Sequence, residues 1–114
     1  MGIIYKVVSR SQWETAEMGG VFVGAEIDLS DGFIHFSTAE QVVETVAKHF
    51  AGQTDLLLVA VETDELGEQL KWEESRGGAM FPHLYSSLPV AAAASVVPLP
   101  LGETGEHVFP AGLK

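Results

Sequence analysis

The sequence predicts an α+β fold, with helices early in the chain and most strands later. Two segments carry this prediction. Apolar residues recur at helical spacing over residues 39–50, which is typical of an amphipathic helix. Residues 56–61 form a nearly continuous apolar run, which is typical of a strand covered on both faces. The chain has 114 residues, 46% of them hydrophobic, so we expect one folded domain over residues 1–114.

The first quarter of the chain predicts a strand, a short helix, a strand fragment and a loop. The strand is β-branched and aromatic, a composition that favours extended backbone. The helix has two possible capping boxes, Ser9 with Gln12 or Ser11 with Glu14. These four elements cover residues 3–8, 9–18, 21–23 and 24–31.

A short strand over residues 33–36 is predicted to run directly into the amphipathic helix. Its side chains alternate, so Ile34 points to one face and His35 to the other. Ser37 and Glu40 fit an S-x-x-E capping box at the start of the helix. Free N–H groups at a helix N-terminus hold anions well, so this junction is a candidate site.

The second half of the chain predicts mostly strands. Pro82 interrupts strand pairing, and Pro89 and Pro98 bracket an alanine- and valine-rich segment that we interpret as a buried strand. The predicted elements are a buried strand at 56–61, one helical turn at 63–67, a strand at 70–73, a polar loop at 74–78, an irregular segment at 80–87, a buried strand at 90–97 and an irregular tail from about 101.

Charge and composition narrow the classes of partner. Six Lys and Arg residues against sixteen Asp and Glu give a net charge of −10, which argues against binding nucleic acid. No apolar run approaches the ~20 residues of a membrane span, and the N-terminus lacks a signal-peptide core. Cysteine is absent. We therefore expect a cytoplasmic protein without a membrane partner.

Histidines offer no metal site by spacing. His35, His49, His83 and His107 lack the H-x-x-x-H and H-E-x-x-H patterns, so no metal is expected. His35 is the leading candidate for ligand contact, and its alternative role is a half-buried histidine bonded to a backbone carbonyl. Ser37 and Thr38 are expected to cap the helix, with contact to a ligand as an additional role.

Two later segments could supply the other wall of a pocket. Trp72, Glu73 and Arg76 end a strand before a Gly-Gly loop, although Trp72 could equally be core and the charges a solvated face. His83 and Tyr85 belong to an aromatic cluster that could stack a planar ring or merely cover the edge of the core. The sequence leaves these alternatives open.

Several blocks of the sequence together resemble one family. These blocks are residues 4–8, Trp13 with Ala16, residues 31–39 (D-G-F-I-H-F-S-T-A), residues 70–73 (L-K-W-E), residues 81–85 (F-P-H-L-Y) and Leu88-Pro89. With these blocks the chain resembles the DUF952 family of small bacterial and plant proteins of undetermined function, over nearly its whole length to about residue 97.

The DUF952 family is remotely similar to the ADP-ribosyltransferase-like fold. That resemblance implies two small, mainly antiparallel sheets around a cleft, with the two predicted helices in the N-terminal half. Residues 33–37 resemble the H-I-H-F-A segment of the RNA 2′-phosphotransferase branch, with His35 at the second histidine. The chain departs from active members by carrying Lys6 where their first strand has histidine or arginine, and it lacks counterparts of the RNA branch's arginines.

The resemblance implies a pocket for NAD or an ADP-ribose-like nucleotide, with NAD as a substrate. If the protein is an enzyme, it would be an NAD-dependent transferase in which Glu73 stabilises a cationic ribosyl centre and His35 bonds a ribose hydroxyl. One alternative is a binding module that kept the fold and lost the chemistry, and another is an RNA 2′-phosphotransferase, which the acidic charge opposes. The expected ligand-contacting residues are His35, Ser37, Thr38, Trp72, Arg76, His83 and Tyr85.

Overall fold

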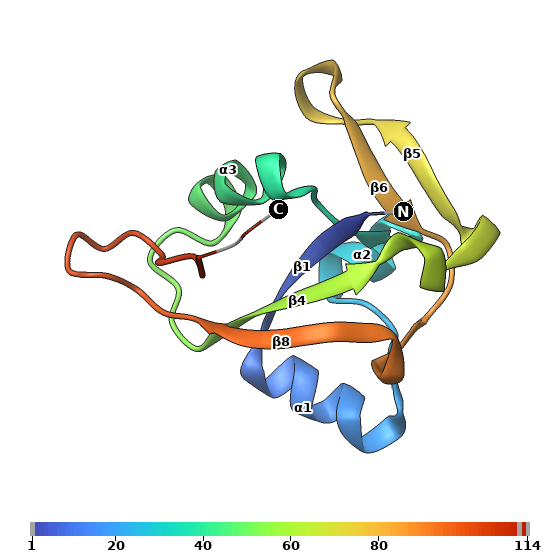
Figure 1. Cartoon of the computed structure of the whole chain (residues 1–114), viewed down its shortest axis with the longest axis horizontal. Coiled ribbons are helices and arrows are strands. Elements are labelled where there is room, and N and C mark those ends of the chain that lie inside the picture. Colours follow the sequence, from blue (N-terminus) through green and yellow to red (C-terminus); the bar gives the residue numbers. More distant parts are fainter. Residues whose placement is uncertain (1, 112, 114) are drawn as a thin grey trace.

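The computed structural model has an α+β fold, which confirms the predicted class (Figure 1). It describes residues 2–111 and 113, and the side chain of Arg76 lies outside the described part. These residues contain three α-helices, all in the first half, and eight strands. In chain order they are β1 (Ile3–Ser9), α1 (Arg10–Gly19), β2 (Val21–Phe22), α2 (Glu26–Asp31), β3 (Ile34–His35), α3 (Ala39–His49), β4 (Leu56–Glu62), β5 (Leu70–Glu74), β6 (Met80–Leu84), β7 (Leu88–Pro89) and β8 (Ala93–Leu99).

The first sheet has the strand order β1-β4-β8, and both of its strand pairs are antiparallel. Its central strand β4 is buried on both faces, as its apolar run predicts. Leu57, Val59 and Val61 face a core shared with α1, whereas Leu56 and Leu58 face a second core beneath α3. Figure 1 shows α1 and α3 on opposite sides of this sheet.

A second sheet has the order β3-β6-β5 and is also antiparallel. The prediction of an irregular segment at 80–87 is therefore wrong, because residues 80–84 form β6 in its centre. Pro82 is tolerated there because it lies opposite the end of the two-residue strand β3. Its carbonyl accepts a hydrogen bond from the Phe36 N–H at 3.0 Å, so the missing proline N–H removes one bond at the end of the ladder.

The described residues form three small sheets, because β2 and β7 pair as a separate two-stranded ribbon. The expectation of two sheets and two helices thus needs correction, since α2 also occupies part of the predicted loop at 24–31. The prediction of a buried strand at 90–97 is right for a strand but wrong in its start and its burial, because Val90–Ala92 form a 3₁₀ turn and β8 lies at the edge of its sheet and is largely exposed. Beyond it the described tail contains only turns and a bridge between Leu101 and His107.

Helix caps differ in one respect from expectation. Ser9 caps α1 in a box with Gln12, which is one of the two predicted boxes. Helix α3, however, is capped by Thr38 with Gln41. Ser37 is unavailable as the cap because its backbone pairs with Tyr5, accepting from the Tyr5 N–H at 2.7 Å and donating to the Tyr5 carbonyl at 2.9 Å.

Candidate functional site

The sheet β3-β6-β5 brings together polar side chains from three separate segments. His35 and His83 are direct partners in the ladder between β3 and β6, so their side chains share one face of the sheet. Lys71 is the partner of His83 on β5, which places Glu73, two residues further, diagonally across from His83 on the same face. Tyr85 follows two residues after His83. Strand pairing therefore places the side chains of His35, His83 and Glu73 on one face of the sheet.

The imidazole of His35 lies between two carboxylates. Its Nδ1 is 2.6 Å from Oδ1 of Asp28, and its Nε2 is 2.9 Å from Oδ2 of Asp31. Asp28 also accepts the main-chain N–H of His35 at 3.1 Å and, through Oδ2, the N–H of Ala25 at 2.7 Å. The short helix α2 supplies both carboxylates, so its position sets the orientation of His35.

Lys6, on β1, completes this group. Its Nζ is 3.0 and 2.9 Å from the two carboxylate oxygens of Asp28, and both side chains are almost fully buried. Burial lowers the pKa of Lys6, and the charge of Asp28 opposes that shift. Burial by itself would raise the pKa of Asp28, but the hydrogen bond from His35 and the charge of Lys6 outweigh it and lower that pKa to about 2. We call Lys6, Asp28, Asp31 and His35 the Asp28 cluster.

A second group centres on Glu73. Its Oε1 is 2.8 Å from Nδ1 of His83 and accepts a hydrogen bond from the Tyr85 hydroxyl at 2.7 Å. These two hydrogen bonds, the His83 bond foremost, lower the pKa of Glu73, and the bond to Glu73 raises the pKa of Tyr85. His83 is buried, whereas Tyr85 is exposed. We call Glu73, His83 and Tyr85 the Glu73 cluster.

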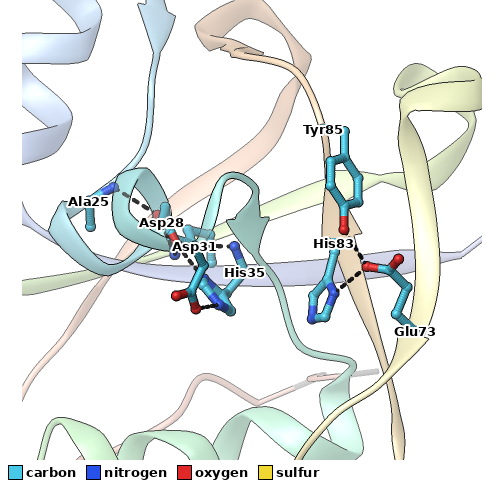
Figure 2. A network of polar contacts seen from close by, with 8 residues as sticks. Ala25, Asp28, Asp31, His35, Glu73, His83 and Tyr85 are labelled. Atoms are coloured by element: carbon cyan, nitrogen blue, oxygen red, sulfur yellow. Dashed lines mark hydrogen bonds and ion pairs between the residues drawn. The ribbon is translucent and has the colours of Figure 1, made fainter.

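The two clusters meet at their histidines. The ring centroids of His35 and His83 are 5.6 Å apart, with the rings edge to face. Phe33 packs against both, stacked on His83 at 4.1 Å and tilted against His35 at 4.6 Å between centroids. It also lies 5.2 Å from the Tyr85 ring. Figure 2 shows His35 beside Asp28 and Asp31 of α2, and His83 and Tyr85 pointing toward Glu73 on the neighbouring strand β5.

A small cavity adjoins these clusters. Its volume is about 210 Å³, and Asp28, Phe33 and Tyr85 form part of its wall together with apolar residues such as Leu29 and Leu84. Drug-sized ligands occupy pockets of roughly 300–1,000 Å³, so this space suits one ring rather than a whole dinucleotide. A second cavity of about 230 Å³ lies beneath the tail, against Tyr5, and shares no residue with either cluster.

Comparison with known proteins places the chain in a family. A model for a protein family of unknown function, DUF952, matches residues 7–96. The chain belongs to the DUF952 family. No curated protein matches it.

Solved structures agree with this assignment. The crystal structure of protein CC0527 from Caulobacter crescentus is 51% identical to this DUF952 chain, covers 93% of both chains and superposes with a TM-score of 0.89. The solution NMR structure of CC0527 is 52% identical and superposes with a TM-score of 0.84, covering 93% of this chain and 91% of the other.

The DUF952 structure gathers four of the residues that the sequence singled out. His35, Glu73, His83 and Tyr85 lie within the two clusters. Their contact with a ligand stays a prediction.

The other candidates lie elsewhere. Thr38 caps α3, and the buried hydroxyl of Ser37 faces that of Thr45 at 3.2 Å. Trp72 is 45% exposed and alternates to the face of β5 opposite Glu73. Arg76 contributes its backbone to a 3₁₀ turn, and its side chain lies outside the described part of the structure.

Sequence reasoning missed Asp28 and Asp31 because residues 24–31 were interpreted as loop. Lys6 gave a signal that could have found Asp28. A lysine between apolar residues on a buried strand requires an acidic partner, since an unpaired buried charge is strongly destabilising.

Two further findings concern metals and membranes. Among residues 2–111 and 113 of this DUF952 protein, no three His, Asp or Glu side chains converge as metal ligands would. No helix in the described part of the chain is both long enough and apolar enough to cross a membrane.

Proposed function

We propose that the face formed by the Asp28 and Glu73 clusters binds a small ribose-containing ligand, of which NAD and ADP-ribose are the first to test. One observation carries this proposal. Two imidazoles, each held by a carboxylate at Nδ1, lie 5.6 Å apart, and their neighbours Asp28, Phe33 and Tyr85 form part of the wall of a cavity of about 210 Å³. Such convergence of polar groups at an apolar hollow is the usual form of a ligand site.

The chemistry of the face suits a sugar joined to a ring. Imidazole, carboxylate and phenol groups can exchange hydrogen bonds with hydroxyl groups. Phe33 and Tyr85 present aromatic surface at the cavity wall, where a planar group can pack. Because the cavity has room for one ring, the remainder of a dinucleotide would lie along the surface outside it.

The charge of the two clusters determines which part of a nucleotide would enter the cavity. Asp28, Asp31 and Glu73 contribute three carboxylates, and the ammonium of Lys6 is already paired with Asp28. This balance favours an uncharged or cationic group over a phosphate. For NAD, the cationic nicotinamide-ribose end would therefore enter. Should transfer chemistry take place, Glu73 is the carboxylate to stabilise the ribosyl cation.

A second candidate function is binding without chemistry. Both ring nitrogens of His35 already have carboxylate partners, so His35 can bond a ligand only if Asp31 gives way. This arrangement favours a module that recognises a ligand and does not transform it. An RNA 2′-phosphotransferase activity fits less well, because the same carboxylates would repel a phosphate.

Ligand-dependent melting tests the proposal. A ligand present at a hundred times its dissociation constant should add about 2.7 kcal/mol to the free energy of unfolding. The panel is NAD, ADP-ribose, nicotinamide riboside and AMP, each at millimolar concentration, and we expect nicotinamide riboside or NAD to raise the melting temperature most. If none raises it, the proposed function is wrong.

Two variants locate the binding site. His35→Ala should weaken binding by ~1 kcal/mol or more, the loss typical of one hydrogen bond. Trp72→Ala removes a large exposed side chain from the opposite face of β5 and serves as the matched control. Equal weakening by both variants would place the ligand elsewhere.

A further inference from the structure

We propose that the free edge of β8 pairs with the same edge of a second copy of this chain. The two copies would be related by a two-fold axis at Val96, so that their β1-β4-β8 sheets join into one continuous antiparallel sheet. β8 does not belong to the sheet that carries the two histidines. The inference is therefore independent of the proposed ligand site.

The backbone bonds of β1 show which groups of β4 face β8. The Tyr5 N–H donates to the Ser37 carbonyl at 2.7 Å, and the Tyr5 carbonyl accepts the Ser37 N–H at 2.9 Å, so both Tyr5 groups point away from β4. Tyr5 lies opposite Ala60 in the ladder between β1 and β4. In such a pair the backbone groups of both residues point away from each other, so those of Ala60 point toward β8.

The same alternation leaves Val96 with free backbone groups. Ala60 lies opposite Ser95 on β8, and these two residues form a hydrogen-bonded pair. The next residue along a strand directs its groups to the other side, so the N–H and carbonyl of Val96 point away from β4. No other strand in the described part of the chain pairs with that side of β8, and Figure 1 shows no segment drawn across it.

The free edge is short and is centred on Val96. At one end the carbonyl of Pro100 accepts the Val108 N–H at 2.8 Å, so the tail occupies the edge beyond the strand. At the other end the 3₁₀ turn Val90–Ala92 precedes the strand. The open part is therefore β8 itself (Ala93–Leu99), whose middle residue is Val96.

A second copy fits this edge because the register is self-complementary. Pairing at Val96 lets the N–H of each Val96 donate to the carbonyl of the other. Pro98 has no N–H, and in this register it lies opposite Ala94 of the second copy, to which it still offers its carbonyl. The Val96 side chain is 37% exposed and would pack against the Val96 side chain of the second copy.

The distribution of charge distinguishes β8 from the other long sheet edge. Two copies of net charge −10 repel each other, so contact is least unfavourable where charged side chains are absent. Residues 77–102 contain no Asp, Glu, Lys or Arg. β5, at the edge of the β3-β6-β5 sheet, instead carries Lys71, Glu73 and Glu74. Charged side chains of this kind protect an exposed edge from pairing, and β8 has none.

The first test measures association and its dependence on salt. Sedimentation velocity from micromolar to millimolar concentration should show an equilibrium between monomer and dimer. Raising the salt from about 0.01 M to about 1 M shortens the screening length from ~30 to ~3 Å, which weakens the repulsion and should strengthen the dimer. A monomer at every concentration, or a dimer that salt weakens, would overturn the proposal.

A pair of variants locates the interface. Val96→Asp places two carboxylates opposite each other at the axis and should weaken dimerisation at least about ten-fold. Val43→Asp adds the same charge at a valine of α3 that is 47% exposed, and it should have little effect on dimerisation. Equal weakening by both variants, or by neither, would show that β8 is not the interface.

The last test traps the pair covalently. The chain has no cysteine, so Val96→Cys introduces a single thiol. The Cα atoms of a hydrogen-bonded antiparallel pair lie ~5.5 Å apart, which a disulfide can span. Mild oxidation should therefore give a covalent dimer of Val96→Cys much faster than of Val43→Cys. Equal rates for the two variants would refute pairing at Val96, whatever the effect of nucleotides on melting.

Discussion

Oδ1 of Asp28 accepts two hydrogen bonds from His35, one from its main-chain N–H at 3.1 Å and one from its ring Nδ1 at 2.6 Å. The same carboxylate holds the Lys6 ammonium and the Ala25 N–H. One buried side chain therefore joins β1, the start of α2 and β3. Because the acidic group is nearly inaccessible to water, its partners are essential to keeping it buried as an anion.

Loss of the Asp28 charge should destabilise the fold strongly. Asp28→Asn leaves the buried Lys6 ammonium without its counter-charge, and breaking such a pair costs about 3–5 kcal/mol. Urea unfolding followed by circular dichroism measures the loss. Asp31→Asn is the matched control, because its exposed contact with His35 should contribute under about 1 kcal/mol. Similar losses in both variants would contradict the central role of Asp28.

Stability should fall in acid through Asp28. Folding lowers the pKa of Asp28 from 3.8 to about 2, so its carboxylate contributes roughly 2 kcal/mol at neutral pH. This contribution is complete above the unfolded pKa and is lost as the pH falls toward 2, with about 1 kcal/mol gone by pH 3. The difference in unfolding free energy between the unmodified protein and Asp28→Asn should therefore shrink from pH 6 to pH 3. A constant difference would refute the assignment.

The cap of α3 should be Thr38 and not Ser37. Thr38→Ala removes the oxygen that accepts the Gln41 N–H at 3.2 Å, and it should cost ~1 kcal/mol in urea unfolding. Glu40→Ala removes the side chain that would complete the box expected from sequence, and it should cost about 0.3–1 kcal/mol, through loss of a carboxylate in the first turn alone. A larger effect for Glu40→Ala than for Thr38→Ala would favour the sequence-based assignment instead.

Tyr85 should lose its proton at a higher pH than an ordinary tyrosine. Its hydroxyl donates to Glu73, and this bond raises its pKa because the phenolate cannot donate. Absorbance at the phenolate band, compared between the unmodified protein and Tyr85→Phe, isolates this ionisation from that of Tyr5. Glu73→Gln should bring the transition back to lower pH. An unchanged transition in Glu73→Gln would show that the bond does not persist in solution.

The sequence predicted the elements whose patterns are local. β4 shows as an uninterrupted apolar run, and the side chains of Ile34 and His35 alternate between core and site as their strand pattern requires. The sequence also predicted that a short strand runs directly into the amphipathic helix. The cap of that helix is Thr38, one residue after the predicted Ser37, because Ser37 pairs with Tyr5.

The features that the sequence did not predict depend on contacts between distant segments. Pro82 reads locally as a strand breaker, and only the short length of its neighbour β3 makes it harmless. The six-residue helix α2 is too short to show a periodic pattern. Asp28 was therefore not predicted as a site residue, although its partner Lys6 is a charged residue within an otherwise apolar strand.

The two residues of β3 link the core and the candidate site through a single register. Ile34 pairs with Leu84 and is buried, while His35 pairs with His83 and faces the polar clusters. A shift of one residue would exchange their faces and place the imidazole in the core. The number of residues between Asp28 and Ile34 must therefore keep Ile34 in the core and also keep His35 beside His83 and Asp28. An insertion there would disrupt folding and the histidine pair together.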